Sequence, residues 1–231
     1  QAVYRPYIAS GYKGNAPTLT DLQAEIKKQP EPEAQELALA AELFISGSLS
    51  IFAQKTNVDQ NNRLTSYNIL DLGEQLLPMG MLVILESIYN RVIQNWRAGR
   101  RTWVFVDEFS IFFRYPFATN FFLRMWKQVR KRAGYMTGIT QNVGEMLTSK
   151  DACWMLANSE FLIMLSQSAS DRAALAELLN ISDTQLSYVE NADPGCGLMK
   201  FGGAFIPFVN SFPEDTELYK LMTTKPADRE Q

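Results

Sequence analysis

Short apolar runs alternate with amphipathic helical segments from about residue 102 onward, and this alternation constrains the fold more than any other feature. The runs 102–106, 135–140 and 161–165 are apolar enough for strands that are covered on both faces. Helical patterns over 117–132 and 142–158 separate them. Strands joined by helices pair in parallel through right-handed crossovers. The sequence therefore predicts an α/β domain with a mostly parallel sheet and flanking helices.

A hairpin is predicted after this region, because residues 197–201 and 204–208 are strand-like and flank Gly202-Gly203. Pro207 suits an edge strand, since proline cannot donate to a sheet ladder. A helix before the hairpin, over 168–179, begins with the capping residues Ser-Ala-Ser-Asp.

The first hundred residues are predicted to be mainly helical, with helices over 22–28, 33–45 and 79–96. Two short apolar segments, Ser48–Phe52 and Arg63–Ile69, are candidate strands on either side of a polar loop.

The composition excludes several kinds of chemistry. The 231 residues include no histidine, which removes Ser-His-Asp and Cys-His nucleophile pairs and histidine metal ligands. Cys153 and Cys196 lack CxxC spacing, which favours buried thiols in a reducing, cytosolic compartment. A net charge of -3 limits any nucleic-acid role to a local basic patch. No apolar run approaches the roughly 20 residues of a membrane helix, and the first residues carry no signal-peptide pattern.

The ends of the predicted parallel strands are where an α/β sheet binds its ligands. Asp107 and Glu108 follow the first apolar run, and Gln141 follows the second. An acidic pair after a buried strand suits nucleotide hydrolysis, with one carboxylate ordering a Mg²⁺-bound water and the other taking a proton from the attacking water. The same pair could simply cap the next helix. Gln141 could contact the γ-phosphate, or only the loop.

Basic residues cluster on the helix between these two strands: Arg124, Lys127, Arg130, Lys131 and Arg132. Three interpretations are open for this cluster. The residues form a solvated helix face, one of them acts as an arginine finger for a neighbouring subunit, or they contact the phosphates of a nucleic acid. Arg172 could serve the same anion or pair with Asp171 or Glu177. The aromatic residues that follow Glu108 are predicted to be core, with a subunit interface as the alternative.

A phosphate-cradling loop, GxxxxGK[ST], does not occur in the 231 residues. Without its lysine and backbone cradle, these residues are expected to bind ATP poorly or not at all.

Several strings in the same order closely resemble the C-terminal ATPase domain of the VirB-four family, the ATPases of conjugative type IV secretion. The strings are Gly73–Leu82, Thr102–Glu108, Thr137–Val143, Leu156–Phe161 and Leu218–Pro226. The resemblance runs from about Pro17 to the end. It implies a RecA-like P-loop NTPase domain, present in part, whose phosphate loop lies upstream in the family.

The resemblance also implies roles for the candidate residues. Asp107 matches the acid that orders Mg²⁺ through water, Glu108 the catalytic glutamate, and Gln141 the glutamine of the family's Thr-Gln motif, which is counted among the catalytic residues. Arg130 resembles an arginine offered in trans to the adjacent subunit, with Lys131 and Arg132 as close alternatives. Arg172 matches an Asp-Arg pair and is assigned to nucleotide binding.

For the whole protein, the resemblance implies ATP and Mg²⁺ as cofactors and hydrolysis coupled to machine assembly and to DNA or protein transfer. The implied partners are other type IV secretion components, the coupling protein and further copies in a hexamer, with DNA as a candidate. The implied location is the cytoplasmic face of the inner membrane. The implied organisation is a lead-in over 1–16, a helical insertion over 17–46, the ATPase core over 47–212, and a C-terminal helix and tail over 213–231. A non-catalytic docking module and a related DNA translocase are the alternatives.

Overall fold

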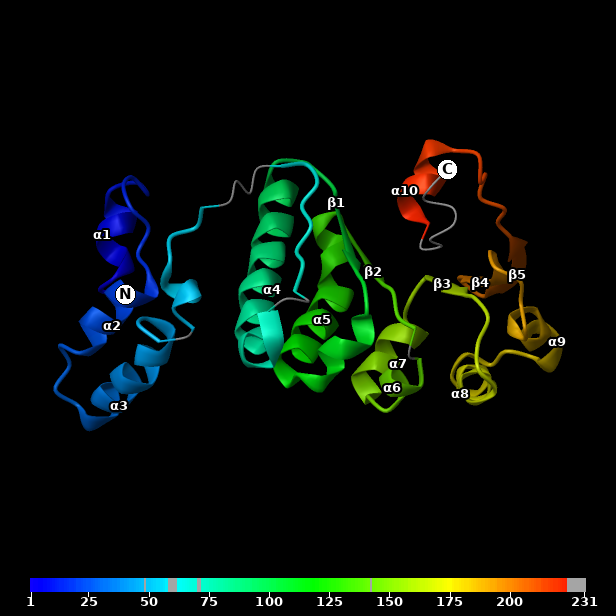
Figure 1. Cartoon of the computed structure of the whole chain (residues 1–231), viewed down its shortest axis with the longest axis horizontal. Coiled ribbons are helices and arrows are strands. Elements are labelled where there is room, and N and C mark those ends of the chain that lie inside the picture. Colours follow the sequence, from blue (N-terminus) through cyan, green and yellow to red (C-terminus); the bar gives the residue numbers. More distant parts are fainter. Residues whose placement is uncertain (48, 58–61, 70–71, 142, 224–231) are drawn as a thin grey trace. The chain divides into compact units, whose positions relative to one another are not determined.

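The fold is described from a computed structural model, which covers residues 1–47, 49–57, 62–69, 72–141 and 143–223. The chain divides into two compact units, Gln1–Leu77 and Pro78–Gln231. Figure 1 shows helices in the first unit and a mixture of helices and strands in the second. The domain boundaries drawn from the sequence remain predictions.

The first unit contains short helices. They are α1 (Tyr4–Ala9), α2 (Leu19–Ile26), α3 (Pro32–Ala41) and the 3₁₀ turns η1 (Glu42–Phe44) and η2 (Ser50–Ala53). Helix α2 begins with a capping box, in which Thr18 and Asp21 satisfy each other's backbone groups. Pro32 opens α3 at a position where its missing N–H costs nothing.

Both strands predicted in the first unit are wrong. Residues 50–53 form the 3₁₀ turn η2, Ser48 lies outside the described residues, and residues 62–69 form no strand. A strand needs a neighbour, and the described residues of this unit supply none. Short apolar runs do not distinguish a strand from a packed turn.

The second unit contains a parallel βαβ element. The long helix α4 (Gly73–Arg97) enters this unit from Pro78 onward and leads to β1 (Thr102–Val106). The connection continues through η4 (Phe109–Arg114), α5 (Pro116–Gln128) and η5 (Val129–Arg132) to β2 (Gly134–Gly138). Strands β1 and β2 pair in parallel, from Thr102 opposite Gly134 to Val106 opposite Gly138. The predicted βαβ unit is confirmed here.

The third predicted strand does not join the parallel pair. Strand β3 (Phe161–Met164) pairs antiparallel with β4 (Cys196–Phe201), which pairs antiparallel with β5 (Ala204–Val209). A mostly parallel sheet is therefore wrong for the described residues, which contain one parallel pair and a three-stranded antiparallel sheet. The predicted hairpin at Gly202-Gly203 is confirmed, and Pro207 lies on the edge strand β5.

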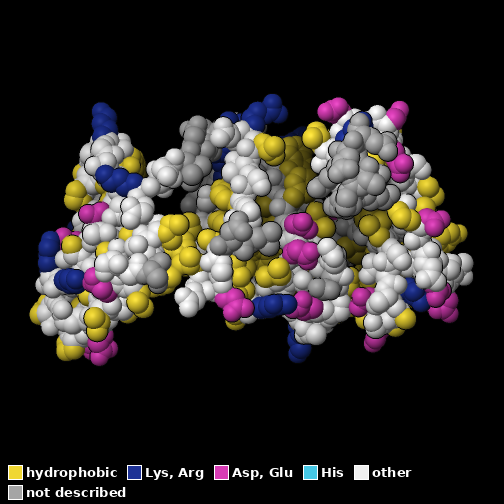
Figure 2. All heavy atoms as spheres, in the orientation of Figure 1, with side chains coloured by type: hydrophobic (Ala, Val, Ile, Leu, Met, Phe, Trp, Pro, Cys, Tyr) yellow, Lys and Arg dark blue, Asp and Glu magenta, His cyan; other side chains and the backbone are white. Residues whose placement is uncertain are grey.

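The second unit contains further helices. They are α6 (Val143–Leu147), α7 (Lys150–Ala157), α8 (Ala169–Leu179), α9 (Asp183–Leu186), the turn η6 (Ser187–Val189) and α10 (Glu217–Met222). Ser168 caps α8 by accepting from the Asp171 N–H, as the sequence predicts. A core of Met164, Leu175, Leu198 and their neighbours joins α8 to the antiparallel sheet. Figure 2 shows that apolar side chains also reach the surface of both units.

Helix α4 is long and apolar enough to cross a membrane by length and composition alone, although the sequence analysis found no apolar run near that length. A core helix of a folded domain passes the same test, but only 22% of the apolar window of α4 is buried. Met81, Leu85 and Val92 recur along one side of α4 and are only 1–3% exposed. Leu85 and Phe121 of α5 line a shared groove, so this one side of α4 faces α5.

Candidate functional site at the carboxyl ends of β1 and β2

The parallel register brings the two predicted strand ends to one edge of the sheet. Val104 and Val106 turn inward from β1 and are each 8% exposed, while the intervening side chains face outward. Because Val106 lies opposite Gly138, the segments that start at Asp107 and Ile139 leave the sheet side by side. The edge therefore receives Asp107 and Glu108 from one strand and Gln141 from the other.

The Glu108 backbone is left-handed, with φ 47° and ψ 47°. This conformation costs a residue with a side chain roughly 1–2 kcal/mol. Two backbone hydrogen bonds enforce the turn: Phe109 N–H donates to Ile139 O at 2.8 Å, and Ile139 N–H donates to Val106 O at 2.9 Å. The strain at Glu108 is thus fixed by an extension of the ladder beyond the strands.

Packing of the Phe109 ring also holds this turn in place. It is 3% exposed and lies so close to Gly138 that a Cβ built there would stand 2.5 Å from a ring atom. Phe109 also makes ring contacts with Phe122 at 4.9 Å, Phe113 at 5.0 Å and Trp126 at 5.5 Å between centroids. Aromatic pairs at these separations pack favourably. The core prediction is confirmed for Phe109, Phe112, Phe121 and Phe122, which are at most 8% exposed.

The polar side chains at the edge touch one another. Gln141 Nε2 donates to Glu108 Oε1 at 3.0 Å, and the Glu108 backbone N–H donates to Asp107 Oδ1 at 3.0 Å. Asp107 and Gln141 are exposed, and Glu108 is half-buried. The structure therefore brings Glu108 and Gln141 into contact and sets Asp107 beside them, while their chemical roles remain predictions.

The basic cluster is elsewhere. Arg130 lies in η5, immediately before β2, and Gln141 follows the other end of that strand. Arg130 is exposed and is not brought to the Glu108 edge within one chain. Other cations of the cluster lie over aromatic rings: Arg124 and Arg132 are 5.0 and 5.5 Å from the Tyr89 centroid. Lys127 similarly lies 4.7 Å from the Trp154 centroid.

Arg172 forms an ion pair and a hydrogen bond with residues of the second unit. Its guanidinium donates to Glu190 Oε1 at 2.7 Å and to the Gln167 carbonyl at 3.2 Å, and the side chain is 19% exposed. The sequence analysis considered Asp171 and Glu177 as partners, whereas the structure gives Glu190. A partner 18 residues away has no signature in local spacing.

The edge offers oxygen ligands but little positive charge. The carboxylates of Asp107 and Glu108 and the Gln141 amide suit a Mg²⁺ ion held through water. Among the described residues, no three histidine, cysteine or acidic side chains gather closely enough to hold a metal directly. One cation missed by the sequence analysis is close in the chain: Arg114, which bonds to Glu145. Arg114 follows the end of β1 and Glu145 follows the end of β2 by a few positions. This spacing in the sequence could have identified them as candidate site residues.

A parallel strand–helix–strand unit with acids and an amide at the strand ends is an arrangement in which α/β sheets bind ligands. No family model and no curated protein matches the chain. Among solved structures, the chain is similar to the structure of VirB4 of Thermoanaerobacter pseudethanolicus, with a TM-score of 0.73 and 23% sequence identity. The similarity covers 90% of this chain and 62% of the solved chain. It shows that the chain shares the fold of that structure, and it agrees with the resemblance read from the sequence.

Proposed function

We propose that these residues are the distal part of an ATPase domain of conjugative type IV secretion. The contact between Gln141 and Glu108 supports this proposal most directly, because it joins an acid and an amide from two parallel strand ends. The similarity to a solved VirB4 structure supports the same class of protein. The chain spans 62% of that structure, so the phosphate loop is proposed to come from a segment outside these residues.

In the proposed reaction, each residue has one task. The Glu108 carboxylate takes a proton from the water that attacks the γ-phosphate. Asp107 holds a water of the Mg²⁺ ion, which supplies charge neutralisation for the phosphates when bound. The Gln141 amide orients Glu108 and the attacking water. Arg130, at the opposite end of β2, serves the site of a neighbouring copy, with Lys131 and Arg132 as alternatives.

The whole protein is proposed to act as a hexamer at the cytoplasmic face of the inner membrane, together with other secretion components and the coupling protein. ATP hydrolysis would drive machine assembly and the transfer of DNA or protein. Arg172 is proposed to assist nucleotide binding only after release from Glu190. One observation favours a second candidate, a docking module without catalysis: the 231 residues contain no phosphate loop.

The test uses the natural protein that contains these residues and measures Mg²⁺-dependent release of phosphate from ATP. We expect Glu108→Gln to lower kcat by about 10²- to 10⁴-fold, because it removes the proton acceptor. Glu177→Gln is the matched control, since Glu177 is an exposed acid on α8 in the same unit. Full activity in Glu108→Gln would refute the role of Glu108, and an inactive parent protein would favour the docking module.

A further inference from the structure

Two side-chain contacts join the segments that leave β1 and β2. The first is the hydrogen bond from Gln141 to Glu108, between residues 33 positions apart. The second joins Arg114 to Glu145, which are 31 positions apart. Glu108 immediately precedes the short turn η4 and Arg114 is its last residue, while Gln141 follows β2 and Glu145 lies in α6. The two contacts therefore tie the same pair of segments at two points.

The Arg114–Glu145 contact has a directed geometry. Nε of Arg114 donates to Glu145 Oε1 at 2.8 Å, and Nη2 lies 2.7 Å from the same oxygen. The Arg114 side chain is 62% exposed and that of Glu145 is 34% exposed. An ion pair this exposed contributes only about 0–1 kcal/mol to stability. Its main physical effect is on where α6 lies against η4.

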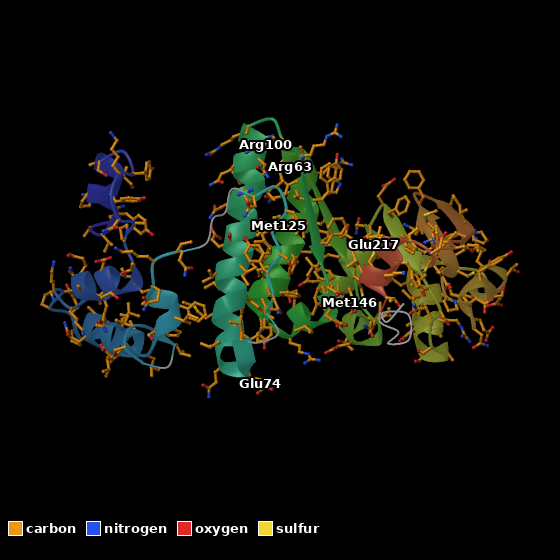
Figure 3. All side chains as sticks on the ribbon, turned by 45° about the horizontal axis from the view of Figure 1, so that its top comes forward. Arg63, Glu74, Arg100, Met125, Met146 and Glu217 are labelled. Carbon is orange, nitrogen blue, oxygen red and sulfur yellow. The ribbon has the colours of Figure 1, made fainter. Side chains whose placement is uncertain are left out.

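Buried residues next to the ion pair anchor both segments in the core. Phe109, at the start of η4, is anchored in the aromatic core, and Met146, next to Glu145 on α6, is 2% exposed. Met146 is labelled in Figure 3, together with Met125 of α5, which is 1% exposed. One end of each segment is thus held by the core. Gln141 itself is exposed, and its side chain is held by the hydrogen bond to Glu108.

We propose that Arg114 and Glu145 are positioning residues that hold the Gln141 amide against the Glu108 carboxylate. The two contacts hold Glu145 to Arg114 and Gln141 to Glu108 between the same two strand-end segments. Breaking the ion pair removes one of the ties between α6 and η4, and the Gln141–Glu108 contact is then held less firmly. This inference rests on the proposed function for its catalytic meaning, but the positioning itself is a property of the 231-residue chain.

The first experiment measures the contact directly in the 231-residue chain by NMR of the Gln141 side-chain amide. Its proton and nitrogen shifts report a charged acceptor, and Glu108→Gln supplies the reference for the loss of that acceptor. We expect Arg114→Gln and Glu145→Gln to move the Gln141 signals toward this reference. The reversed pair, Arg114→Glu with Glu145→Arg, should return them toward the parent position.

The matched control is Glu190→Gln, which breaks another ion pair of 2.7 Å in the same unit and should leave the Gln141 signals in place. Parent-like Gln141 signals in folded Arg114→Gln and Glu145→Gln chains would overturn the proposal. If either variant does not fold, Arg114→Lys keeps the charge but lacks the side-on guanidinium. A small shift toward the reference is then the supporting result, and no shift overturns it.

The second experiment measures hydrolysis by the natural protein. We expect Arg114→Gln to lower kcat about ten- to a hundredfold with an unchanged KM for ATP, since a misplaced group impairs the chemical step more than binding. The reversed pair should restore part of kcat. A parent protein without ATPase activity would refute the proposed function, while the NMR result would still decide the positioning role.

Discussion

The first unit and the strand-end site of the second are stabilised in different ways. In the described part of the first unit, the buried side chains are Gln23, Ala38 and Ala53, none of them a large apolar residue. Gln23 Nε2 donates to the Ala38 carbonyl at 2.8 Å and to Glu42 Oε2 at 2.6 Å. Behind Glu108, by contrast, lies a cluster of interlocked aromatic rings centred on Phe109 and Phe122.

The two regions also differ in the hydrogen bonds that their carboxylates, Glu42 and Glu108, accept. Glu42 accepts hydrogen bonds from the Ser46 hydroxyl, the Gln23 amide and the Lys27 ammonium, so its bonding capacity serves the fold. Within the part of the chain that the structure describes, Glu108 accepts one side-chain hydrogen bond, from Gln141, and its backbone is fixed by packing instead. A reacting carboxylate needs a fixed position together with free lone pairs. An aromatic core supplies the first without consuming the second.

Removing the aromatic support should have the largest effect. Phe122 is 1% exposed and contacts the rings of Phe109, Phe112 and Phe121, so Phe122→Ala is expected to cost about 3–5 kcal/mol of the free energy of unfolding. Chemical denaturation followed by tryptophan fluorescence measures this unit alone, because all four tryptophans lie after residue 77.

The matched control for this prediction is Leu221→Ala in the second unit. Leu221 is 75% exposed, so the substitution should change the free energy of unfolding by less than about 0.5 kcal/mol. A loss of under 1 kcal/mol in Phe122→Ala would contradict the idea that the rings hold the site.

Relief of backbone strain at the site should have a smaller effect, and of opposite sign. Glu108→Gly is expected to stabilise the second unit by about 0.5–1 kcal/mol, because glycine adopts φ 47° without a steric penalty. The same variant should lose ATP hydrolysis in the natural protein. Denaturation curves and phosphate release measure the two effects separately.

Ala133→Gly is the control for strain relief away from the site. Ala133 has φ 50° at the end of η5, so glycine should stabilise it similarly, without touching Glu108 or Gln141. A destabilised Glu108→Gly, with Ala133→Gly stabilised, would mean that contacts of the Glu108 side chain outweigh the strain.

The sequence predicted the local parts of this architecture. The βαβ unit, the cap at Ser168 and the hairpin at Gly202-Gly203 follow from periodicity, capping and turn chemistry, which act within a few residues. The placement of Glu108 and Gln141 at one edge also followed, because parallel strands present their carboxyl ends there, whereas the hydrogen bond between them was not predicted.

The remaining features depend on contacts that local patterns do not specify. An apolar run such as Phe161–Leu165 indicates a strand but not its partner, and Met164 pairs with Leu198 far along the chain. The 3₁₀ turn over Ser50–Ala53 has the composition of a short strand. The partner of Arg172 and the pair formed by Arg114 and Glu145 likewise arise only once the chain is folded.

The smallest expected effect is the pH dependence of the polar network in the first unit. The Ser46 hydroxyl, then the Gln23 amide and Lys27, lower the pKa of Glu42 from 4.5 to about 2. A carboxyl whose pKa is lower in the folded state stabilises fully above about pH 4.5, and this contribution is lost as the pH falls through about 2. Glu42→Gln should remove that part of the acid sensitivity. Helical circular dichroism between pH 5 and about 2 measures this acid sensitivity, and tryptophan fluorescence follows the second unit as an internal reference.

Because Asp21 also titrates with a lowered pKa, held down by the Thr18 N–H, only the difference between parent and variant isolates the contribution of Glu42. Identical acid transitions in the two proteins would mean that Glu42 does not stabilise the first unit, and that its small apolar core suffices.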